Sequence, residues 1–110
     1  MKIKVTARHF KAHETLIEYV EKAIEGLEHY YDGILKADVV LSFEKARNSD
    51  KIAEIELFVY GAVLTAKGKS DDYKKSVDSS VEKILTQLKK YKDKLHKKDR
   101  IGVRKVREKE

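Results

Sequence analysis

The sequence predicts an α+β fold, a two-layer sandwich in which a four-stranded sheet carries two helices on one face, in the order β-α-β-β-β-α. Four short segments alternate apolar and polar residues, which is the side-chain period of a half-buried strand. Two longer segments repeat apolar residues every three or four positions, as amphipathic helices do. The chain has 110 residues, 41% of them hydrophobic and 40% charged, which predicts one domain with a modest core and argues against disorder.

The first two elements follow from a change of period early in the chain. Residues 2–9 alternate apolar with polar or basic side chains and predict a strand. The apolar side of this strand consists of Ile3, Val5 and Ala7. Residues 13–31 predict a helix, because their apolar residues recur at helical spacing opposite a row of glutamates. Asp32-Gly33 then supplies a stop signal.

Three further strands are expected after this helix. Residues 39–43 alternate in the first of them and residues 53–59 in the second, and a polar stretch over residues 46–51 joins the two. Tyr60-Gly61 marks a tight turn into the last strand. The inward positions of that strand are Ala62, Leu64 and Ala66.

The second helix begins near Ser70, where a capping side chain and two following aspartates suit the positive end of a helix dipole. Its apolar residues form one stripe, long enough to cross a four-stranded sheet: Tyr73, Val77, Val81, Ile84, Leu88, Tyr91 and Leu95. The pattern dissolves after Lys97. We therefore expect a domain over residues 1–97 and a basic, flexible tail or linker over residues 98–110.

Composition and charge exclude several classes of protein. The chain has no Cys, which excludes a disulfide framework and a Cys-ligated zinc site. No apolar run approaches the roughly 18 residues of a membrane span. The net charge of +6 is uneven, because residues 1–68 hold ten basic and eleven acidic residues whereas residues 69–110 hold fifteen and eight. We expect a cytoplasmic protein whose basic end binds a polyanion and not a membrane.

The basic residues of the second helix are unevenly distributed around it. At about 100° per residue, one flank of the apolar stripe carries lysines and no acidic residue. These lysines are Lys83, Lys90, Lys94 and Lys97. Four ammonium groups at successive turns repel one another unless an anion compensates. The flank therefore predicts contacts with phosphates along an RNA groove, which read shape and charge rather than sequence.

The first strand carries a second set of basic residues on its outer side. Lys2, Lys4 and Arg8 could extend the RNA-binding surface. An equally good interpretation is that their charges protect an edge strand from pairing with other chains.

No catalytic or metal-binding residue is predicted. Gly68-Lys69-Ser70 resembles the end of a phosphate-binding loop, but Val63 stands where that loop needs its first glycine. The four histidines are scattered, which argues against a metal site. Glu54 and Glu56 are explained by a solvated strand face. We expect no enzymatic activity, no cofactor and no small-molecule substrate.

The second helix carries motifs of a known family: Val77-Asp78, Val81-Glu82-Lys83-Ile84, Gln87-Leu88 and Lys90-Tyr91-Lys92-Asp93-Lys94-Leu95. In these motifs the chain resembles the bacterial ribosome hibernation-promoting factors, a family that includes the ribosome-associated translation inhibitor called protein Y and the sigma-54 modulation proteins. Earlier segments agree, namely Val5-Thr6-Ala7-Arg8, Leu27-Glu28, Tyr30-Tyr31 and Val39-Val40-Leu41. The resemblance spans residues 2–97 and implies the same β-α-β-β-β-α fold.

The resemblance implies a ribosome-binding inhibitor of translation. Members of this family occupy the groove of the small ribosomal subunit where mRNA and tRNA meet, contact its rRNA, and preserve idle ribosomes during stress. The lysines that match the family are Lys83, Lys90, Lys92 and Lys94. Lys74-Lys75-Ser76 departs from the usual Tyr and two Ala, so a contact carried by that Tyr is not expected here. His13 replaces the hydroxyl residue that commonly caps the first helix.

Several alternatives stay open at this point. The β-β-β-α portion is arranged like a generic double-stranded-RNA-binding module, and the basic flank could instead dock an acidic protein partner. Family members are either short or extended by a linker and a domain that pairs two ribosomes. The chain could be a short member or the N-terminal part of a long one, and residues 98–110 could be a linker or an extension into the mRNA channel.

Overall fold

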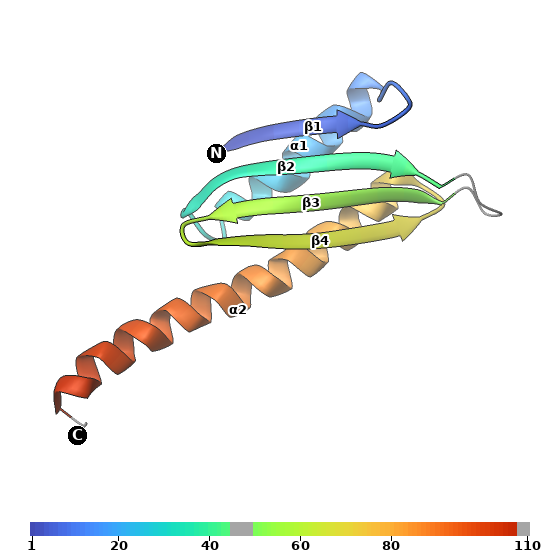
Figure 1. Ribbon diagram of the computed structural model, residues 1–110. Helices are drawn as coiled ribbons and strands as arrows, with labels where there is room; N and C mark the ends of the chain where they lie inside the picture. Colours follow the sequence, from blue (N-terminus) through green and yellow to red (C-terminus); the bar gives the residue numbers. More distant parts are fainter. Residues whose placement is uncertain (45–49, 108–110) are drawn as a thin grey trace.

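The computed structural model describes residues 1–44 and 50–107, with side chains as far as Leu95 (Figure 1). The elements are β1 (Lys2–Ala7), α1 (Glu14–Glu28), β2 (Ile34–Phe43), β3 (Lys51–Val59), β4 (Ala62–Ser70) and α2 (Tyr73–Arg107). The predicted order β-α-β-β-β-α is confirmed. β1 ends at Ala7, before its predicted end, and His9 beyond it takes a φ of 65°, outside the range of a strand.

The strands form one mixed sheet in the order β1-β2-β3-β4. β1 runs parallel to β2 because the chain crosses through α1 between them, and the other neighbours are antiparallel. The register aligns Val5 with Val39, Val39 with Ile55, and Ile55 with Ala66. An apolar row therefore crosses all four strands on one face of the sheet.

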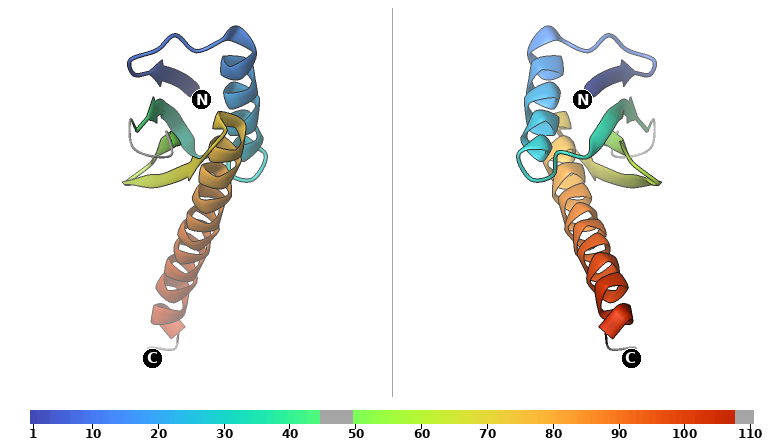
Figure 2. Two further views of the ribbon diagram at one scale, coloured as in Figure 1. Left: turned by 90° about the vertical axis from the view of Figure 1, so that its right-hand side faces the viewer. Right: turned by 90° about the vertical axis from the view of Figure 1, so that its left-hand side faces the viewer.

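Both helices cover that same face, as predicted (Figure 2). α1 packs against β1, α2 packs against β3 and β4, and the helices also contact each other. The core between the two layers consists of side chains that are completely or almost completely buried: Val20, Ile24, Val39, Leu41, Ile55, Leu57, Val77, Ile84 and Leu88. Neither described helix covers the opposite face of the sheet, whose side chains alternate with those of the core.

α1 begins at a histidine cap. The Nδ1 atom of His13 accepts a hydrogen bond of 3.3 Å from the backbone N–H of Thr15. Imidazole thus takes the part that a hydroxyl or carboxylate usually takes at this position. At the other end of the helix, the N-terminal amine lies 3.2 Å from the carboxylate of Glu28.

α2 begins against the end of β4. The carboxylate of Asp72 accepts a hydrogen bond of 3.4 Å from the N–H of Lys74, so Asp72 is the capping residue. A Cβ atom at Gly68 would lie 2.1 Å from the carbonyl oxygen of Ser76, so only glycine permits this approach of strand and helix. The hydroxyl of Ser76 donates to the carbonyl of Lys51, 2.6 Å away. This buried serine is therefore part of the helix–sheet contact.

α2 continues past the sheet as far as Arg107 (Figures 1 and 2). Its backbone runs without interruption through the domain boundary that the sequence predicts at residue 97. The division into residues 1–97 and 98–110 stays a prediction. Within the described part of the chain, no helix is both long and apolar enough to cross a membrane.

Candidate nucleic-acid interface

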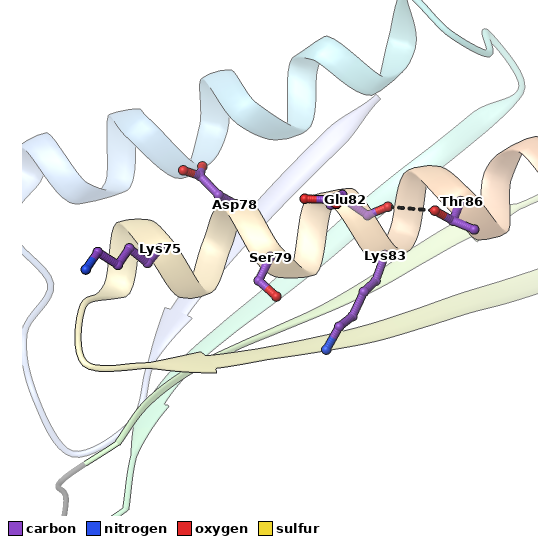
Figure 3. A pocket seen from close by; sticks show the side chains of 6 residues that line it. All are labelled: Lys75, Asp78, Ser79, Glu82, Lys83 and Thr86. Atoms are coloured by element: carbon purple, nitrogen blue, oxygen red, sulfur yellow. Dashed lines mark hydrogen bonds between the residues drawn. The ribbon is translucent and has the colours of Figure 1, made fainter.

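The acid-free flank of α2 faces the edge strand β4. Figure 3 shows Ser79 and Lys83 pointing toward β4, whereas Asp78 points toward α1. Asp78 accepts a hydrogen bond of 2.6 Å from the hydroxyl of Tyr19 on α1. This bond raises the pKa of Tyr19 above its ordinary value, and partial burial adds to the effect. Asp78 therefore lies on the side of α2 that meets α1.

The opposite side, which we call the β4-side flank, consists of Lys83, Gln87, Lys90 and Lys94. Two of its side chains are hydrogen-bonded to the sheet. The ammonium group of Lys83 donates to the carbonyl oxygen of Lys67 at 2.8 Å, and the side-chain amide of Gln87 donates to the carbonyl of Thr65 at 2.6 Å. The flank thus satisfies backbone acceptors on the outer edge of β4. An ammonium group has three donors, so Lys83 keeps two for a phosphate.

Lys90 and Lys94 lie further along the same flank, and both are exposed. Lys94 adjoins the turn between β3 and β4, where it lines a hollow together with Tyr60 and Tyr91. Among the residues with described side chains, no ion pair joins a carboxylate to Lys83, Lys90 or Lys94. Within this part of the chain, no ion pair therefore neutralises their positive charges.

Lys92 lies on the other side of α2. Its ammonium group donates to the carbonyl oxygen of Tyr30 at 3.0 Å and lies 5.0 Å from the centre of that ring. Lys92 is half-buried between α2 and the end of α1. The structure therefore separates Lys92 from the three lysines of the β4-side flank.

The basic residues of the first strand lie apart from α2. Lys2, Lys4 and Arg8 are exposed, and the first two alternate with Ile3 and Val5 of the core, so they belong to the open face of the sheet. β1 and β4 are opposite edges of the sheet, three strand spacings or about 14 Å apart. The structure does not bring these residues together with the β4-side flank.

The backbone of Lys97 is helical and belongs to α2. Its side chain falls outside the part of the structure in which side chains are described. Its predicted role in RNA binding stays a prediction.

The helical periodicity of α2 could not reveal Lys67, a basic residue of β4 that lies next to the β4-side flank. Its side chain is exposed on the open face of the sheet, and its carbonyl holds Lys83. The alternation of β4 was a usable signal, since it places Lys67 and Lys69 at outward positions. Lys69 differs because the carboxylate of Glu44 lies 2.7 Å from its ammonium group and raises its pKa.

Among the described residues, no three His, Asp or Glu side chains come together as a metal site needs. The depression drawn in Figure 3 has a volume of about 390 Å³ and is an open, mixed-charge stretch of helix surface. What the arrangement can do is attract and position an anion.

The β-α-β-β-β-α fold with a basic second helix defines a class of protein, and comparison with known sequences identifies the family. The profile of the family described as Sigma 54 modulation protein / S30EA ribosomal protein matches residues 3–96. The chain therefore belongs to that family, which includes ribosome hibernation factors. It is 32% identical over 95 residues to the ribosome hibernation promoting factor of Escherichia coli K12, covering 86% of this chain and 97% of that protein.

Another relative is longer. The ribosome hibernation promotion factor of Picosynechococcus is 34% identical over 97 residues, which cover 86% of this chain but 50% of that protein. The chain thus matches about half the length of that relative.

Two solved structures share the fold. A ribosomal subunit interface protein from Coxiella burnetii superposes with a TM-score of 0.77 at 29% identity, covering 84% of this chain and 99% of the other. The N-terminal domain of protein Y from Thermus thermophilus gives a TM-score of 0.74 at 30% identity, covering 83% and 99%.

Proposed function

We propose that this protein is a hibernation factor that binds the small ribosomal subunit in the groove where mRNA and tRNA meet, and so inhibits translation. The β4-side flank of α2 lies against phosphates of the rRNA. The observation that carries the proposal is the placement of Lys83, Lys90 and Lys94 on an exposed flank that contains no acid and adjoins β4.

The geometry of the flank suits a phosphate backbone. Eleven helical positions separate Lys83 from Lys94, which corresponds to about 16 Å along the helix axis. A row of that length can reach several phosphates of one RNA strand. Lys83 enters such a contact already oriented, because its bond to the carbonyl of Lys67 restricts the side chain before RNA arrives.

The relatives support the same partner. Proteins similar to this chain are named ribosome hibernation promoting factors, and one of its structural neighbours is named a ribosomal subunit interface protein. Phosphate contacts made by α2 would position the domain without reading a base sequence. Blocking the groove requires occupancy rather than catalysis, so this function needs no active site.

The remaining predicted residues belong to the proposal in different ways. Lys92 joins α2 to the end of α1 through its bond to the carbonyl of Tyr30, and it would meet RNA on the side of α2 away from the β4-side flank. Lys2, Lys4 and Arg8 would contact a second RNA segment, because they lie at the opposite edge of the sheet.

Cosedimentation with purified small subunits tests the function directly. We expect the chain to pellet with small subunits and to be displaced poorly by an excess of free RNA duplex, and we expect it to inhibit translation in a cell-free system. Efficient displacement by free duplex would indicate a generic double-stranded-RNA-binding module instead. Failure to pellet with subunits would overturn the proposal.

A further inference from the structure

An exposed aromatic ring stands at the far end of the β4-side flank. Tyr60 occupies the turn between β3 and β4, and 83% of its surface is exposed. No other large hydrophobic residue with a described side chain is as exposed. A tyrosine side chain combines a large apolar ring with a polar hydroxyl, and such residues are enriched at interfaces. Here both the ring and its hydroxyl are open to solvent.

The backbone beneath this ring is fixed to α2. Val59 pairs with Ala62 across the turn, so the connection has only two residues, and Gly61 takes a φ of 85° that other residues rarely adopt. The hydroxyl of Tyr91 on α2 donates a hydrogen bond of 2.5 Å to the carbonyl of Tyr60. The position of Tyr60 relative to the lysines of α2 is therefore set by the fold.

Turn and helix enclose a hollow of about 330 Å³, within the range of small-ligand sites. Its lining is mainly apolar, with one cation and no acidic residue: Tyr60, Gly61, Ala62, Tyr91, Lys94 and Leu95. Lys90 lies one helical turn before Lys94 on the same flank. An aromatic face beside an ammonium group matches the two ends of a nucleotide, its base and its phosphate.

We propose that this hollow binds one unpaired nucleotide of RNA, with its base stacked on the ring of Tyr60 and its phosphate at the ammonium group of Lys94. The inference rests on the proposed function and adds to it that the RNA at this end of α2 is single-stranded. A paired base within a helix has both faces covered by its neighbours, so only an unpaired base can offer a face to Tyr60. The absence of acids from the lining favours this anionic ligand.

Four variants of Tyr60 test the stacking. Dissociation constants for small ribosomal subunits are measured by cosedimentation titration at one salt concentration for Tyr60→Phe, Tyr60→Trp, Tyr60→Leu and Tyr60→Ala. Stacking on an aromatic side chain contributes about 1 to 3 kcal/mol per base. We therefore expect Tyr60→Ala and Tyr60→Leu to weaken binding about 5- to 150-fold. Tyr60→Phe and Tyr60→Trp should bind within about twofold of the wild type, because both keep an aromatic face.

The matched control is Tyr30→Ala, which makes the same change on the opposite side of α2, beside Lys89 and Lys92. It should leave affinity almost unchanged, and circular dichroism should show all five variants folded. If Tyr60→Leu and Tyr60→Phe bound equally well, residue 60 would make a plain apolar contact rather than stack on a base. If Tyr60→Ala kept wild-type affinity, the hollow would not be a binding site. Either result overturns the inference while the proposed function stands. A wild-type protein that does not bind subunits would overturn both.

Discussion

The double substitution Lys90→Gln with Lys94→Gln isolates the electrostatic contribution of the β4-side flank. Both side chains are exposed, and glutamine is an uncharged polar residue with a helix propensity close to that of lysine. We leave Lys83 in place because its ammonium group also donates to the carbonyl of Lys67, so its replacement would disturb the contact between helix and strand. The change therefore removes two positive charges while the fold keeps its internal contacts.

The expected size follows from counterion release. Each phosphate neutralised by a lysine contributes about −0.9 to the slope of log affinity against log salt for a duplex. Removing two such contacts should make the slope less negative by about 1.8. If affinities converge near 1 M salt, this change corresponds to about a 60-fold loss of affinity at 0.1 M salt. The free energy of unfolding should change by no more than about 0.5 kcal/mol per substitution.

The measurement is a titration of small subunits at four or more salt concentrations, with Lys75→Gln plus Lys89→Gln as the control. This control makes the same charge change on the same helix. Lys75 already lies 3.6 Å from the carboxylate of Asp71, and Lys89 lies over the ring of Tyr30 on the α1 side. The control slope should differ little from the wild-type slope. Equal slopes for the two double variants would mean that net charge alone matters and that the β4-side flank is not the binding face.

Three further outcomes test how the helices pack, with urea denaturation followed by circular dichroism as the assay. Gly68→Ala should lower the free energy of unfolding by about 1 to 3 kcal/mol, because its Cβ would overlap the carbonyl of Ser76. Gly26→Ala should raise the free energy of unfolding by up to about 1 kcal/mol, since no atom lies within 4 Å of the added Cβ. Equal stability of the two alanine variants would contradict the close approach of Gly68 to α2. Tyr19→Phe should cost about 0.5 to 1.5 kcal/mol near neutral pH. Because the bond to Asp78 raises the pKa of Tyr19, that contribution is present below pH 10 and should fade as pH rises through the folded pKa; a cost that persists in strong base would contradict it.

The fold could be predicted from the sequence because each element buries only one side. Ile3 and Val5 alternate with lysines in β1, and Val77, Ile84 and Leu88 recur at helical spacing in α2, so period alone separates strand from helix. Boundaries were less predictable. β2 begins at Ile34 rather than at Val39, because a bulge between Ile34 and Lys36 interrupts the alternation on which the prediction depended.

The candidate site was predictable only where it depends on one helix. Helical periodicity placed Lys83, Lys90, Lys94 and Lys97 on one flank of the helix, and in the structure Lys83 and Lys94 lie beside β4 and its turn. Periodicity within a helix does not say which neighbour covers which flank. The bond of Lys92 to Tyr30 depends on how α1 docks against α2. The separation of β1 from that flank depends equally on the order of the strands.

The asymmetry of α2 also determines how the protein would approach RNA. On one side of α2 lies Asp78, and beyond it α1, which contains five glutamates and one lysine. On the other side lie the β4-side flank and the exposed lysine Lys67 of β4. A polyanion is repelled from the first side and attracted to the second, since the field of each surface is the sum of its charges. We therefore expect the domain to meet the rRNA with the edge of β4 and the hollow at Tyr60, and to keep α1 turned away from it.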